Sequence, residues 1–101
     1  MQYNKLVRDK IPEIILAQGE KPVTRVLEDA EYLACLEQKL REETAEYLES
    51  GKLDELADIM EVVYALCEAR GYSCGELAAA YERKHQARGG FQKRIFLISK
   101  T

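Results

Sequence analysis

The sequence contains no tryptophan, two prolines and a single histidine, His85. Its three cysteines, Cys35, Cys67 and Cys74, are odd in number and have no CxxC or Cys/His spacing, so neither a disulfide framework nor a zinc site is predicted. We expect these cysteines to pack as small hydrophobic side chains. The lone histidine lies in a polar stretch, which disfavours Ser/His and Cys/His nucleophilic chemistry.

Long apolar runs are also missing. No stretch approaches the roughly 20 apolar residues that a membrane-spanning helix needs, and the start lacks a signal-peptide pattern. We therefore expect a cytoplasmic protein with no membrane partner. The 101 residues are 47% apolar and 33% charged, which predicts one folded domain over residues 1–101. A core of this size is marginal alone, so packing against a second copy is expected.

The net charge is only −3, but it is unevenly distributed. Residues 1–25 carry five basic and three acidic side chains, residues 26–82 carry four and fifteen, and residues 83–101 carry six and none. An acidic middle could hold cations while basic ends bind phosphate groups. The alternative is ordinary charge alternation that keeps a small protein soluble.

Hydrophobic periodicity and helix-end signals predict a mainly helical fold. Asp29 is the expected N-cap of one long helix, and Ser73 with Glu76 has the capping-box spacing at the start of another. Gly19 and Gly71 are expected to follow helix ends. The predicted helices cover about residues 8–19, 29–50, 52–71 and 73–88.

Two short segments have the character of β-strands. Residues 21–27 and 93–100 contain β-branched or aromatic side chains and are too short to stand alone. We expect them to pair with each other or with residues 4–7. The predicted architecture is a helical bundle with short terminal β-strands.

Some carboxylates of the first long helix fall on its apolar side. Because a helix turns about 100° per residue, Glu43 lies within the same arc as Leu36, Leu40 and Tyr47. Glu46 falls at the edge of that arc. This helix therefore directs two carboxylates toward its packed face.

The second long helix repeats this arrangement. Glu55 lies within the arc of Ile59 and Val62, and Asp58 lies at its edge. The tight connection near Ser50 predicts an antiparallel hairpin, in which Glu43 would face Asp58 and Glu46 would face Glu55. Burying such carboxylates is costly without compensating charge, and oxygen ligands favour Mg²⁺, with Mn²⁺ as an alternative. The alternative reading is an acidic groove without function.

Two acidic motifs carry a resemblance to a known family. EETAE at 42–46 and ELAD at 55–58 resemble the EExxE and ExxD signatures of the MazG-like, or all-α, nucleoside triphosphate pyrophosphohydrolases. Residues 3–15 and 88–97 resemble a compact, phosphoribosyl-ATP pyrophosphohydrolase-like subgroup. The resemblance implies a helical bundle that assembles as a homodimer or a dimer of dimers. It also implies Mg²⁺-dependent cleavage of the α–β phosphoanhydride bond of a nucleotide.

The same resemblance assigns expected roles to residues. Glu43, Glu46, Glu55 and Asp58 match the metal ligands, and Glu42 matches an acid that orients the attacking water. Lys39 matches a lysine that precedes the acidic motif in the phosphoribosyl-ATP enzymes. The basic residues that we expect to bind substrate phosphates are Lys5, Arg8, Lys10, Lys39, Lys84, Arg88, Lys93 and Arg94.

The expected function is hydrolysis of nucleoside triphosphates to monophosphate and pyrophosphate, as house-cleaning of non-canonical nucleotides. The true phosphoribosyl-ATP pathway enzymes carry a histidine after the ExxD motif, and this chain has none there. That pathway activity and a non-catalytic helical dimer or regulatory module are the alternatives. A specific nucleic-acid partner is not expected, because the central helices are acidic.

Overall fold

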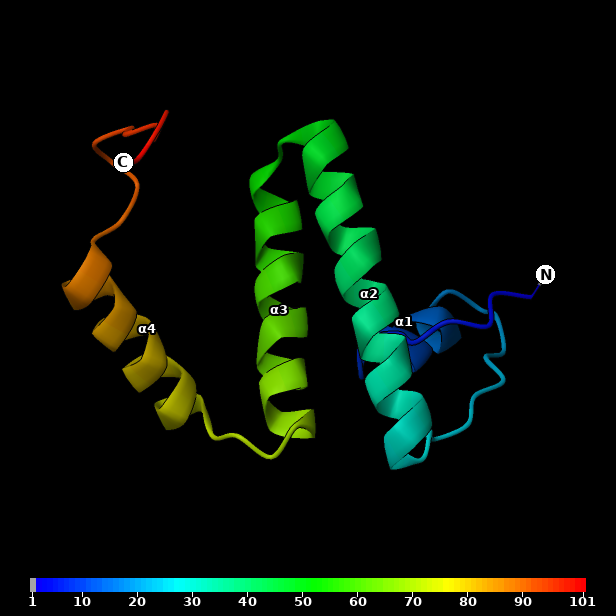
Figure 1. Ribbon diagram of the computed structural model, residues 1–101. Coiled ribbons are helices and arrows are strands. Elements are labelled where there is room, and N and C mark those ends of the chain that lie inside the picture. Colours follow the sequence, from blue (N-terminus) through cyan, green and yellow to red (C-terminus); the bar gives the residue numbers. More distant parts are fainter. Residues whose placement is uncertain (1) are drawn as a thin grey trace.

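The computed structural model describes residues 2–101 and contains four helices (Figure 1). This arrangement confirms the predicted mainly helical fold. None of the four is long and apolar enough to cross a lipid bilayer. The helices are α1 (Ile11–Ala17), α2 (Asp29–Ser50), α3 (Leu53–Ala69) and α4 (Cys74–Arg88).

Most helix ends follow the sequence signals. Pro12 lies in the first turn of α1, where its missing N–H costs nothing. At the start of α4, the Ser73 hydroxyl accepts a hydrogen bond from the Glu76 backbone N–H and the Glu76 carboxylate accepts one from the Ser73 N–H, which confirms the capping box. The predicted Asp29 cap is wrong, because Glu28 occupies the N-cap position of α2 and makes no side-chain capping bond.

Helices α2 and α3 form an antiparallel hairpin and lie side by side along their length (Figure 1). Gly51 ends α2 in the left-handed conformation, with φ of 67°, and its N–H donates to the Tyr47 carbonyl at 2.8 Å. Glycine has no Cβ to oppose this conformation. The Ser50-Gly51 turn therefore sets how the acidic faces of the two helices meet.

The core of a single chain is small. Leu36 of α2 and Val62 and Cys67 of α3 are buried, and all three lie in the hairpin. Cys67 thus packs as predicted, whereas Cys74 is exposed and that part of the cysteine prediction is wrong. The radius of gyration is 17.9 Å, well above the roughly 13 Å of a compact domain of about 100 residues.

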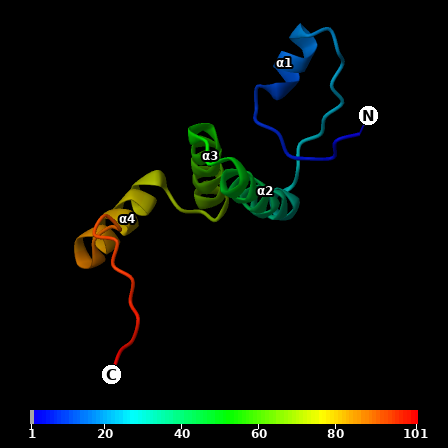
Figure 2. The same cartoon turned by 90° about the horizontal axis from the view of Figure 1, so that it is seen from above.

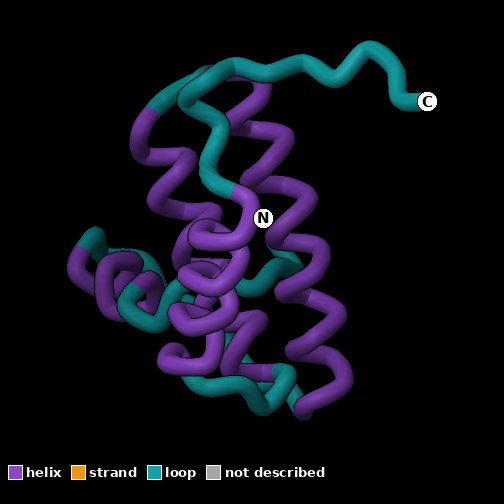
Figure 3. Tube along the Cα trace, turned by 60° about the vertical axis from the view of Figure 1, so that its left-hand side comes forward, coloured by secondary structure: helices purple, strands orange, loops and turns teal. Residues whose placement is uncertain are grey.

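The predicted terminal β-strands are wrong within residues 2–101, which form only helices, turns and loops (Figure 3). Val23 and Val26 are almost fully exposed, as is Phe96. The N-terminal segment with α1 and the C-terminal segment after α4 lie on opposite sides of the hairpin (Figure 2). Residues 21–27 and 93–100 are thus held apart, and neither forms a strand with residues 4–7. Strands this short do not form without a partner.

Candidate metal centre

Three carboxylates from the hairpin come together across the α2–α3 contact. Glu43 of α2 and Glu55 and Asp58 of α3 each offer one oxygen, and these oxygens all lie within 4.8 Å of one another. All three side chains are half-buried. Glu55 and Asp58 are three residues apart and so share a helix face, and the hairpin brings Glu43 opposite them. We call these three residues the acidic triad.

Glu46, the fourth predicted ligand, lies beside the triad but outside it. It is exposed, and its negative charge contributes to the raised pKa of Glu43. Glu46 is not one of the three carboxylates whose oxygens all lie within 4.8 Å of one another. One Glu55 oxygen accepts a hydrogen bond from the Ser50 hydroxyl at 3.3 Å. This hydrogen bond joins Glu55 to Ser50 at the end of α2, and the helical periodicity did not predict it.

Glu43 is the member of the triad whose charge is least compensated. Burial raises the pKa of its carboxyl, the negative charges of Glu46 and Asp58 raise it further, and Lys39 opposes the shift. Its Oε2 atom is buried and has no hydrogen-bond partner. A buried oxygen without a donor is destabilising unless a proton or a cation satisfies it. This is the feature of the triad that points to a bound cation.

Arg8 supplies the nearest positive charge to the triad. Its Nη2 atom lies 2.6 Å from Asp58 Oδ1, and its Nη1 atom lies 3.3 Å from Glu61 Oε1. The sequence placed Arg8 among the phosphate-binding candidates and did not indicate this pairing. No spacing rule connects residues 50 positions apart, so the opposite charges of Arg8 and Asp58 were the only sequence signal for this ion pair.

Lys39 and Glu42 form an ion pair on α2. Lys39 lies one helical turn before Glu43, and Glu42 lies one turn before Glu46. Lys39 Nζ lies 3.6 Å from Glu42 Oε2, and the lysine side chain is the more buried of the two. The carboxylate expected to orient water is thus held next to the triad's helix face by a cation. Both residues lie on α2 with Glu43, which keeps them close to the candidate centre.

The other basic candidates lie elsewhere. Lys5 sits over the Tyr3 ring at 5.6 Å, Lys10 precedes α1, and Lys84 is exposed on α4. Within residues 2–101, no cation after Arg70 forms an ion pair with a carboxylate. The C-terminal positive charges are therefore not neutralised inside the chain.

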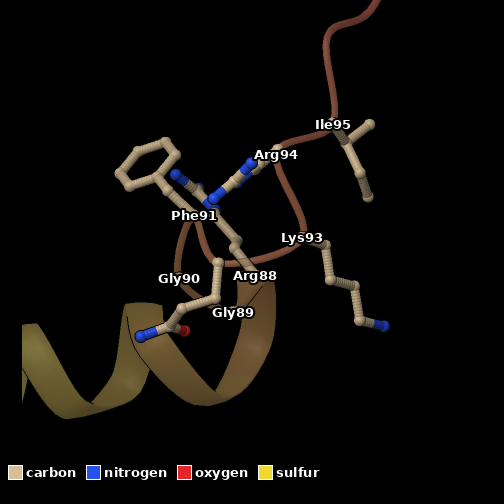
Figure 4. Close-up of a pocket in the computed structure, with 8 residues that line it drawn as sticks. Arg88, Gly89, Gly90, Phe91, Lys93, Arg94 and Ile95 are labelled. Atoms are coloured by element: carbon tan, nitrogen blue, oxygen red, sulfur yellow. The ribbon is translucent and has the colours of Figure 1, made fainter.

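Three of these C-terminal cations gather at one loop. Arg88, Lys93 and Arg94 surround a hollow of about 380 Å³ after α4, with Phe91 on the same loop (Figure 4). The loop stands apart from the α2–α3 hairpin (Figure 1). The structure thus assembles an acidic centre and a basic loop but does not bring them together within one chain.

A second hollow of about 560 Å³ lies near the open end of the hairpin, between Asp9 of the N-terminal segment and residues of α2 and α3. Tyr32 lines it together with Asp29 and Glu68. The acidic lining does not suit a phosphate group. Sequence periodicity could not predict this hollow, because Asp9 lies outside the long helices.

The donor set of the triad suits a hard divalent cation. Three carboxylates offer oxygen atoms, and neither histidine nor cysteine is among them. Mg²⁺ prefers oxygen ligands and retains several water molecules, so three protein oxygens are a reasonable set. Mn²⁺ accepts the same ligands, whereas zinc sites more often use nitrogen or sulfur.

No family model matches the chain, and no solved structure matches it. An uncharacterized protein of Mycolicibacterium smegmatis is 60% identical over 42 residues. This match covers 42% of the present chain and 43% of the relative, so less than half of either protein is compared.

Proposed function

We propose that the chain is a Mg²⁺-dependent nucleoside triphosphate pyrophosphohydrolase of the MazG-like type. The observation that carries the proposal is the acidic triad, in which Glu43 Oε2 is buried without a partner. The EETAE motif of α2 supplies Glu43, and the ELAD motif of α3 supplies Glu55 and Asp58. The reaction consumes water and a nucleoside triphosphate and gives a monophosphate and pyrophosphate.

In this proposal, Glu43, Glu55 and Asp58 would hold the metal, and Glu46 would be the fourth ligand. A bound Mg²⁺ supplies positive charge that offsets the phosphate charge in the transition state and acidifies a nearby water. Glu42 accepts a hydrogen bond from the attacking water and so orients it. The Lys39 contact positions the Glu42 carboxylate for this role.

Basic residues complete the site by binding the outer phosphates and the leaving pyrophosphate. Arg88, Lys93 and Arg94 form no ion pair within residues 2–101, and because their loop stands apart from the triad in one chain, they would reach the site only from a second copy of the chain. Arg8 is already beside the triad. Arginine suits this task because its guanidinium can bind two phosphate oxygens at once.

We further propose that the chain works as a homodimer or a dimer of dimers. A stripe of apolar side chains on α3, Leu56, Met60 and Val63, remains exposed at helical spacing. Exposed apolar surface of this kind marks interaction sites. The same stripe also favours the second candidate function, a non-catalytic helical dimer or regulatory module, which predicts self-association without metal binding.

Pyrophosphate release from a panel of canonical and non-canonical nucleoside triphosphates, with and without Mg²⁺, tests the enzyme proposal. Replacing Glu43 with Gln or Asp58 with Asn should reduce turnover at least about 100-fold, because the metal loses a charged ligand. Glu49→Gln is the matched control, since Glu49 lies on α2 and is exposed. Turnover in the first two variants equal to that of the parent would reject the metal-site assignment.

A further inference from the structure

Arg8 ties the N-terminal segment to the hairpin. Of the side chains in residues 2–24, that of Arg8 alone forms a hydrogen bond to α2 or α3. Helix α1, which follows it, contains no buried residue. The attachment of this segment therefore relies on one guanidinium and on partial packing of a few side chains.

The carboxylate that binds Arg8 also belongs to the acidic triad. Asp58 Oδ1 lies 2.6 Å from Arg8 Nη2, and an Asp58 oxygen lies within 4.8 Å of oxygens from Glu43 and Glu55. A divalent cation in the triad and the guanidinium would repel each other, and both would be attracted to the negative charge of Asp58. The two cations thus compete for one anion.

This ion pair is placed where it can be exchanged. The side chains of Arg8, Asp58 and Glu61 retain 54%, 37% and 58% of their exposure. Exposed ion pairs are weak and are screened by salt. The electrostatic attraction between Asp58 and a divalent cation held by three carboxylates would exceed the attraction that Asp58 loses with the guanidinium.

We propose that Arg8 is an internal counter-ion that a divalent metal displaces from Asp58, so that metal binding releases the N-terminal segment from the hairpin. The inference rests on the proposed function, because it takes the acidic triad to be the metal site. The freed guanidinium is then available to a phosphate group of the substrate. In the metal-free protein, the same contact offsets part of the negative charge of α3.

Mn²⁺ titration by calorimetry measures the competition. Arg8→Gln should bind Mn²⁺ about two- to fivefold more tightly than the parent at low salt, the range expected from losing a weak exposed pair. The difference should shrink at high salt. Lys21→Gln is the matched control: it removes one charge from an exposed residue of the same segment that forms no ion pair within residues 2–101, and its affinity should equal that of the parent.

Amide hydrogen exchange measures the release independently of affinity. Mn²⁺ should accelerate exchange over residues 5–18 in the parent and in Lys21→Gln. In Arg8→Gln this region should exchange fast before any metal is added, and Mn²⁺ should change it little. A through-space charge effect alone would tighten Mn²⁺ binding without this change in exchange.

The outcomes separate this inference from the proposed function. If the parent binds Mn²⁺ and Arg8→Gln binds it equally or more weakly, Arg8 supports the metal ligand and the displacement is wrong, while the metal site stands. Unchanged exchange over residues 5–18 on adding metal would also overturn the displacement. If neither protein binds Mn²⁺, the metal site fails and the displacement fails with it.

Discussion

At the scale of single residues, one carboxylate, that of Glu43, lies where its negative charge lowers the stability of the fold. Glu43 is half-buried, its Oε2 has no donor, and Glu46 and Asp58 add negative charge around it. Lys39 and Arg8 lie nearby, but each is paired with another carboxylate. Such an arrangement is expected of a site that binds a cation, and it has a measurable consequence for stability.

Glu43→Gln should raise the free energy of unfolding of the metal-free protein by about 1 kcal/mol at neutral pH. Because the folded-state pKa of Glu43 is raised, the folded protein holds this proton more tightly than the unfolded chain does. The parent should therefore lose stability as pH rises from the ordinary pKa of a glutamate to the raised one.

Urea unfolding across that pH range, with EDTA present, measures this effect. The variant should lack the part of the pH dependence that comes from residue 43. Adding Mg²⁺ at neutral pH should reverse the order, since it stabilises only the protein that can bind it. Equal pH profiles for the two proteins would show that Glu43 carries no excess charge cost.

At the scale of elements, the turn between α2 and α3 determines where Glu43 of α2 lies relative to Glu55 and Asp58 of α3. Gly51 has a φ of 67° and nothing lies within 4 Å of a Cβ added there, so only backbone strain opposes a substitution. Gly51→Ala should lower the free energy of unfolding by about 1 kcal/mol and weaken Mn²⁺ binding.

Gly75 provides the matched control for that substitution. It lies inside α4, and an added Cβ would be 3.8 Å from the Ser73 hydroxyl, which is an ordinary contact. Gly75→Ala should leave stability unchanged or raise it by up to about 1 kcal/mol, because alanine favours helices. Urea unfolding of both variants checks the pair, and an equal loss at both positions would contradict the role of the turn.

The helices could be predicted from sequence because their signals are local. The extent of α2, the capping box of α4 and the inward placement of Glu43, Glu55 and Asp58 follow from periodicity and end signals. Helix α3 is shorter than the predicted 52–71, and the N-cap of α2 is Glu28. The terminal strands could not, because a strand needs a partner and the two ends of the chain lie apart. The Arg8–Asp58 pair depends on a contact between distant segments that no local pattern reveals.

At the scale of the whole molecule, much apolar surface remains outside the small core. Leu53, Leu56, Met60 and Val63 on α3 are exposed. With three buried hydrophobic side chains within residues 2–101, a single chain has little to offset its conformational entropy. Self-association would supply the missing burial.

Met60→Glu should shift the protein toward the monomer and lower its thermal midpoint by several degrees, because a charge in an apolar interface is costly. Glu49→Gln, an exposed change on α2, should leave the oligomeric state unaltered. Sedimentation over a range of protein concentrations measures both variants. A parent protein that stays monomeric at high concentration would contradict the assembly proposal.

If the acidic triad is the metal site of a pyrophosphohydrolase, as we propose, the protein releases pyrophosphate from a nucleoside triphosphate only when Mg²⁺ is present. The test is ³¹P NMR of the products that the 101-residue chain forms with Mg²⁺ across a nucleotide panel. A nucleoside monophosphate and pyrophosphate should appear together in equal amounts, and EDTA should stop their formation. Formation of a diphosphate with inorganic phosphate, or no turnover of any nucleotide in the panel, would contradict this proposal.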